Sequence, residues 1–74
     1  KSTAEPHPSY VERMIAHAWE KLATRAGKEG NLEKRDEYRK EALRQWKENT
    51  KKHPQDKISR SAYNYWKKIV GEEN

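Results

Sequence analysis

The 74-residue chain contains no cysteine and no phenylalanine, only one methionine, and three residues each of proline and glycine. Without cysteine, neither a disulfide framework nor thiol chemistry is available. The sequence therefore does not indicate whether the protein works in an oxidising or a reducing compartment. No apolar run approaches the roughly 20 residues that a membrane-spanning helix needs, and no signal-peptide pattern opens the chain. We therefore expect a soluble, intracellular protein that does not enter a membrane.

Signals for catalysis and cofactor binding are also missing. His7, His17 and His53 are too scattered for a zinc site, because no pair has the i, i+4 spacing and no cysteine supports them. Ser59 and Ser61 have no identifiable base, and the chain has no glycine-rich phosphate loop. The sequence thus predicts a protein that is not an enzyme and that uses no metal or cofactor.

Charge is what the chain has in abundance. Charged residues make up 39% of the sequence, and 17 Lys and Arg against 12 Asp and Glu give a formal net charge of +5. This excess favours anionic partners, either nucleic acid or an acidic protein surface. Hydrophobic residues make up only 31%, so the three tryptophans and the tyrosines must supply much of the core, at roughly 150–250 Å² per ring.

Helical spacing of the apolar residues predicts three helices between an N-terminal arm and a short acidic tail. A chain of this length forms one domain with one small core. The predicted fold class is therefore all-α, a single small three-helix bundle domain at residues 9–71. The expected ranges are 1–8 for the arm, 9–26, 31–52 and 59–70 for the helices, and 72–74 for the tail.

Local residues mark the ends of these helices. Ser9 fits a capping box at the first helix, and Gly27 is placed to end that helix in a left-handed conformation. Asn31 can cap the second helix. The His53-Pro54 pair ends the second helix, because the residue before a proline is disfavoured in helical backbone. The expected core residues are Val11, Ile15, Ala18, Trp19, Leu22, Tyr38, Ala42, Trp46, Ile58, Ala62, Trp66 and Ile69.

The segment at residues 58–70 is the one place where aromatic and basic residues alternate with no acid between them. On a helix, its apolar residues gather on one side and its basic residues on the other. Arg and Asn side chains can read base edges, and Lys can bind phosphates. The leading hypothesis is a helix-turn-helix-like DNA-binding domain whose third helix contacts the duplex. Its predicted contact residues are Arg60, Ser61, Asn64, Lys67 and Lys68, with Lys40, Arg44, Lys47 and Lys51 of the second helix.

The alternative hypothesis is a helical protein-interaction or regulatory adaptor module without nucleic-acid contact. Tyr and Arg are enriched at the centres of protein interfaces, and the candidate anchors are Arg35, Arg39, Tyr10, Tyr63 and Tyr65. A small domain with one short reading helix binds a single half-site weakly. We therefore expect either a homodimer or attachment to a larger protein. The first residue is Lys and not Met, which favours a processed chain or an excised domain.

Overall fold

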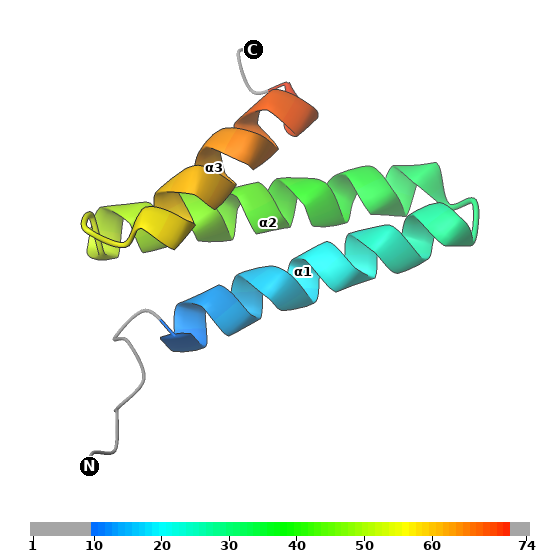
Figure 1. Cartoon of the computed structure of the whole chain (residues 1–74). Coiled ribbons are helices and arrows are strands. Elements are labelled where there is room, and N and C mark those ends of the chain that lie inside the picture. Colours follow the sequence, from blue (N-terminus) through cyan, green and yellow to red (C-terminus); the bar gives the residue numbers. More distant parts are fainter. Residues whose placement is uncertain (1–9, 72–74) are drawn as a thin grey trace.

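The computed structural model describes residues 10–71, which form three α-helices joined by short turns (Figure 1). Helix α1 spans Tyr10–Lys28, α2 spans Leu32–Lys52 and α3 spans Lys57–Val70. No strand occurs among these residues, and the predicted all-α three-helix fold is confirmed. The predicted arm at 1–8, the cap at Ser9 and the tail at 72–74 lie outside the described residues.

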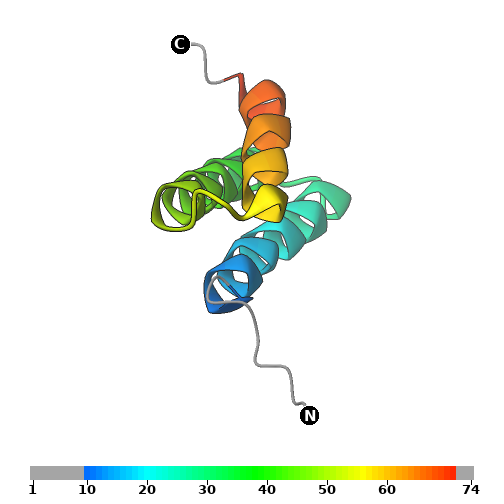
Figure 2. The same ribbon diagram turned by 60° about the vertical axis from the view of Figure 1, so that its left-hand side comes forward.

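Helices α1 and α2 form an antiparallel hairpin, and α3 crosses one face of it (Figures 1 and 2). The central helix is α2, which packs against both of the others, whereas α1 and α3 touch each other less. The helical body extends over 46 × 26 × 13 Å. Because it is long and flat, large parts of α1 and α3 face away from any other helix.

The turn between α1 and α2 differs from the expected one. Gly27 was predicted to be a left-handed cap, and this is wrong because α1 continues through it to Lys28. The left-handed residue is Gly30, with φ 80°. The backbone N–H of Asn31 then donates to the carbonyl of Ala26 at 2.9 Å, and the Asn31 side chain caps α2 as predicted.

Helix α3 begins at Lys57, because the side chain of Asp56 accepts a hydrogen bond from the backbone N–H of Ile58 at 3.1 Å. The same carboxylate accepts a hydrogen bond from the Ser59 hydroxyl at 2.7 Å. Gly71 ends the helix with a left-handed φ of 73°, which a glycine adopts without steric cost.

The core is organised around Trp46 of α2, which is fully buried beside Ala16 of α1 and Ala42 of α2. The half-buried residues that pack against this centre are Trp19, Ala62, Tyr63 and Trp66. Small side chains line the buried side of α1, namely Ala16, Ala23 and Ala26. An alanine-lined helix face allows a neighbouring helix and a bulky indole to approach closely.

Part of the predicted core is wrong, because α1 and α3 are rotated relative to the expected orientation. The predicted core residues that are exposed are Val11, Ile15, Ala18, Leu22, Ile58 and Ile69. On α1 the alanine side packs inward instead of the more apolar side. On α3 the inward positions are Ser59, Ala62, Tyr63 and Trp66. Polar contacts of Ser59 and Trp66, described below, hold this rotation.

Candidate nucleic-acid interface

The outward side of α3 forms a cationic ridge, defined here as Lys57, Arg60, Ser61, Asn64, Lys67 and Lys68. All six side chains are exposed, and α3 contains no acidic residue. Among the described residues, none of the four basic side chains of the ridge makes an ion pair. The Lys67 ammonium lies 5.3 Å from the centre of the Tyr63 ring, a cation–π contact that favours its position beside the core.

Two polar contacts on the opposite side of α3 fix which residues form this ridge. The Trp66 indole Nε1–H donates to Glu20 Oε2 of α1 at 2.7 Å. The buried Ser59 hydroxyl donates to Asp56 Oδ2 at 2.7 Å. Ser59 and Trp66 lie within about 20° of each other around the helix, so both contacts select the same rotation and turn Arg60, Asn64 and the lysines outward.

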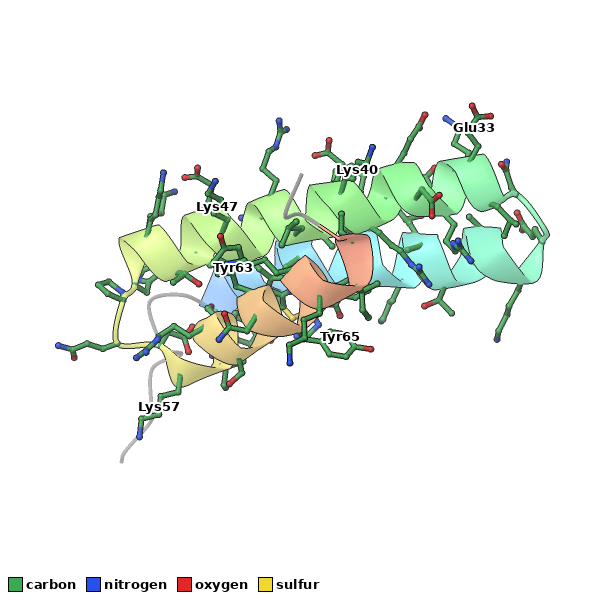
Figure 3. All side chains as sticks on the ribbon, turned by 90° about the horizontal axis from the view of Figure 1, so that it is seen from above. Glu33, Lys40, Lys47, Lys57, Tyr63 and Tyr65 are labelled. Carbon is green, nitrogen blue, oxygen red and sulfur yellow. The ribbon has the colours of Figure 1, made fainter. Side chains whose placement is uncertain are left out.

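The predicted contacts from α2 divide into two groups. Lys40, Lys47 and Lys51 are exposed and make no ion pair within the described part of the chain. Lys40 and Lys47 extend from the outer edge of α2 (Figure 3). Arg44 instead donates to Glu41 Oε1 at 3.2 Å, so its charge is partly compensated.

The edge of α2 adjoins the ridge near the end of α3. A hollow between the two helices is lined by Lys40 together with Ile69 and Val70 of α3. Figure 3 shows Tyr63 between α3 and α2, and the Lys67 ammonium packs over this ring. The cationic side chains of α2 and α3 therefore belong to neighbouring surfaces, although Asp36 also lines the hollow.

The anchors predicted for a protein interface do not gather on one surface. Tyr10 begins α1 and Tyr63 packs against the core, whereas Tyr65 is 59% exposed. Arg35 and Arg39 are half-buried. Arg35 also bonds to Asp36 at 3.1 Å, and its aliphatic part lies close to Gly27 of α1.

A groove also lies between α1 and α3. It encloses about 600 Å³, with Ile58, Tyr65 and Ile69 on its α3 side. Its α1 side carries His17, and Glu20 lies between the helices. The apolar residues of α3 that were expected in the core thus form one wall of this open groove.

Glu20 is a structural residue that was not among those predicted from the sequence. Its Oε2 accepts hydrogen bonds from two indoles, Trp46 Nε1 and Trp66 Nε1, each at 2.7 Å. Its Oε1 lies 3.0 Å from His17 Nδ1. Because buried Trp N–H groups need acceptors, a core rich in tryptophan was the available signal that some polar side chain must face inward.

Comparisons with known proteins add no relative: no family model, no curated protein and no solved structure matches this chain. None of the described helices is long and apolar enough to cross a membrane. The chemistry and arrangement of the described side chains are therefore what indicate a function.

Proposed function

We propose that this domain binds nucleic acid, in the first instance duplex DNA, through the cationic ridge of α3. The observation that carries the proposal is that four exposed basic residues share one helix with no acid and make no ion pair among the described residues. Lysines and arginines left unpaired in this way are free to replace the counterions of a phosphate backbone.

The shape of α3 supports a groove-directed contact. The helix crosses the outside of the α1–α2 hairpin (Figure 1), so its outer side projects from the domain. The connection from α2 to α3 covers residues 53–56, a length typical of helix-turn-helix units. In this arrangement Arg60 and Asn64 lie one turn apart near the middle of the ridge and are the residues suited to base edges.

The remaining basic residues fit a role at phosphates. Lys57 and Lys67 lie on the ridge on either side of the Arg60–Asn64 pair, and Lys68 follows directly. Lys40 and Lys47 of the neighbouring α2 edge extend the positive surface. The N-terminus of α3 takes no phosphate in this proposal, because the negatively charged Asp56 carboxylate already accepts the Ile58 N–H there.

The test is a chemical-shift titration of the labelled domain with a random-sequence duplex of about 15 base pairs, roughly the length of one and a half helical turns. We expect shifts confined to residues 57–68 and to the Lys40–Lys51 edge. With about four phosphates neutralised by the ridge, the logarithm of the binding constant should fall with log salt at a slope of about −3 to −4.

Variants with equal charge change provide the control. Lys67→Ala should reduce the salt slope by about one unit, and Arg60→Ala should lower the affinity as well. Lys34→Ala removes the same charge on α2, where Lys34 pairs with Glu37 at 3.7 Å, and should change the slope much less. Absence of salt-sensitive shifts at low salt, or equal effects of all three variants, would refute the proposal.

A second candidate function is protein binding in the groove between α1 and α3. It is favoured by the exposure of Ile58, Tyr65 and Ile69 beside the half-buried Trp66, since large exposed apolar patches mark interaction sites. A partner in this groove would lose affinity on Tyr65→Ala and keep it on Arg60→Ala. If the ridge binds DNA, Arg60→Ala should lower the affinity for the duplex and Tyr65→Ala should not.

A further inference from the structure

A pocket of about 370 Å³ lies where the three helices meet, near the turn that joins α1 to α2. Its walls include Lys28 of α1, Arg35 and Arg39 of α2 and Trp66 of α3, and these four residues define what is called here the arginine pocket. Three of the four are cations, and none of the described residues that line the pocket is acidic. No residue of the cationic ridge lines it, so the pocket is a separate positive site.

Arg39 is the central cation of this site, because it also borders the groove toward α3 and the hollow beside Ile69. Its side chain is half-buried, yet within the described chain that side chain makes no ion pair, hydrogen bond or cation–π contact. Its nitrogens are not among the enclosed polar atoms that lack a partner, so the guanidinium reaches solvent. A half-buried cation in this position favours an anion that arrives from solution.

The other two cations differ in how far their charge is compensated. Arg35 donates from Nε and Nη2 to Asp36 Oδ1 at 3.2 and 3.1 Å. Lys28 is exposed and makes no ion pair among the described residues. Lys28 and Arg39 therefore give the pocket two positive charges that no described carboxylate balances.

Gly27 allows the wall of the pocket to form. The aliphatic part of Arg35 packs against this residue of α1, where a Cβ would lie only 3.3 Å from Arg35 Cδ. Glycine is one of the least favourable residues within a helix, yet α1 continues through Gly27. The missing side chain lets Arg35 approach α1 closely at the edge of the pocket.

We propose that the arginine pocket binds the phosphate group of a phosphate monoester, either free or at the 5′ end of a nucleic-acid strand. Such a group carries a charge of about −1.5 to −2 at neutral pH and three acceptor oxygens, which matches the two uncompensated cations. A carboxylate carries one negative charge and leaves the second cation unbalanced. The Arg39 guanidinium presents paired N–H donors that fit two phosphate oxygens, and Lys28 adds a point charge.

Two carboxylates share a depression with Arg39, and both are engaged elsewhere. Asp36 accepts both hydrogen bonds from Arg35. Glu20 accepts the indole N–H groups of Trp46 and Trp66 at Oε2. Because the Trp66 N–H is used in this way, its indole contributes an apolar wall to the pocket, beside which charges are less screened than in open water.

Titration of the labelled intact chain with inorganic phosphate tests the site, at constant ionic strength and at about pH 7.5, where the phosphate is largely doubly charged. We expect saturable shifts of the Arg39 Nε–H and of the Lys28 and Trp66 resonances, with a dissociation constant in the millimolar range. Acetate should bind about tenfold more weakly, because it loses one charge-assisted contact.

Two variants with an equal change of charge locate the site. Arg39→Gln should raise the dissociation constant for phosphate about tenfold or more. Arg60→Gln removes the same charge from the ridge and should change it by less than about twofold, because salt screens distant charges. Arg39→Gln breaks no contact of the described fold, so the circular dichroism spectrum should stay unchanged. If it does change, Lys28→Gln at an exposed position is the second test, with an expected weakening of about threefold or more.

Two duplexes, identical except for a 5′-phosphate or a 5′-hydroxyl, separate the two sources of the phosphate. If the pocket binds a strand end, the phosphorylated duplex should bind more tightly, and Arg39→Gln should abolish the difference while Arg60→Gln keeps it. If the pocket binds a free monoester, the two duplexes should bind equally while inorganic phosphate still shifts the pocket resonances.

The acidic residues Glu72 and Glu73 follow α3 and lie outside the described residues. A variant with Glu72→Gln and Glu73→Gln shows whether their carboxylates compete for the pocket. Its affinity for phosphate should stay within about threefold of the wild-type value. A gain of about tenfold or more would identify these carboxylates as the occupant and overturn the proposal.

Three further outcomes contradict the phosphate site: no saturable shifts with phosphate, equal binding of acetate, or equal losses in Arg39→Gln and Arg60→Gln. The titration with inorganic phosphate contains no nucleic acid. Its result is therefore independent of the proposed binding of DNA to the ridge.

Discussion

Replacing Glu20 by Gln tests the contact that joins all three helices. Glu20 of α1 accepts the indole N–H of Trp46 from α2 and of Trp66 from α3, both at Oε2 and both at 2.7 Å. Its side chain is 24% exposed, whereas Trp46 is completely buried. The substitution keeps the size and shape of the side chain and removes only the negative charge.

The expected cost follows from the two hydrogen bonds. A bond to a charged acceptor contributes about 1.5–3 kcal/mol and one to a neutral acceptor about 0.5–1.5 kcal/mol. Loss of the charge at two bonds therefore removes about 2 kcal/mol. Glu20→Ala removes the acceptor altogether and leaves the buried Trp46 N–H unsatisfied, so about 3 kcal/mol or more is expected.

Urea unfolding followed by circular dichroism at 222 nm measures these losses. In a domain of this size, 2 kcal/mol lowers the melting temperature by roughly 10 °C. Glu48→Gln makes the same change of charge at an exposed residue of α2 without an ion pair in the described chain, and should cost less than about 0.5 kcal/mol. The indole N–H resonances of Trp46 and Trp66 should move on Glu20→Gln, while that of Trp19 stays.

The reasoning is refuted if Glu20→Gln and Glu48→Gln differ by less than 0.5 kcal/mol or if the two indole resonances do not move. A double-mutant cycle with Trp66→Phe gives an independent check. If Glu20 and Trp66 are bonded as observed, the two changes together should cost less than the sum of the single changes.

Two further predictions concern the packing of α1 and the start of α3. Ala16→Leu should destabilise the fold by about 1–3 kcal/mol because Ala16 is fully buried beside Trp46 and the core has no room for a larger side chain. Ala18→Leu, on the exposed side, should change stability by less than about 0.5 kcal/mol; equal losses in urea unfolding would mean that α1 is rotated differently. Asp56→Ala should cost about 2 kcal/mol, because it removes the cap of α3 and the acceptor of the buried Ser59 hydroxyl. Asp56→Asn retains a capping side chain and should cost less, and an equal loss for the two variants in thermal unfolding would contradict the capping role.

The number and type of the helices were predictable because their signals are local. Asn31 caps α2 through the N–H of Lys34, three residues away. The His53-Pro54 step and Gly71 end α2 and α3 through the backbone preferences of one or two residues. The outward position of Arg60 and Asn64 was also predictable, since the apolar and basic residues of α3 already occupy opposite sides.

The sequence did not show which side of α1 faces the core. On α3 it did not show that Ser59 and Tyr63 pack inward while Ile58 and Ile69 stay exposed. Apolar content favoured Val11, Ile15 and Leu22 on α1, yet the alanine side packs inward. Two causes depend on contacts between helices. The alanine face allows α2 and the Trp46 indole to approach α1 closely, and Glu20 then accepts hydrogen bonds from the indoles of Trp46 and Trp66.

The helices were therefore determined by the sequence alone, through interactions between residues one to four positions apart. The orientation of each helix, and with it the exposed apolar side of α1 and the groove beside α3, was decided by the tertiary structure. Glu20 meets indoles 26 and 46 positions away along the chain. Contacts over such separations depend on how closely the helices approach, which helical periodicity does not specify.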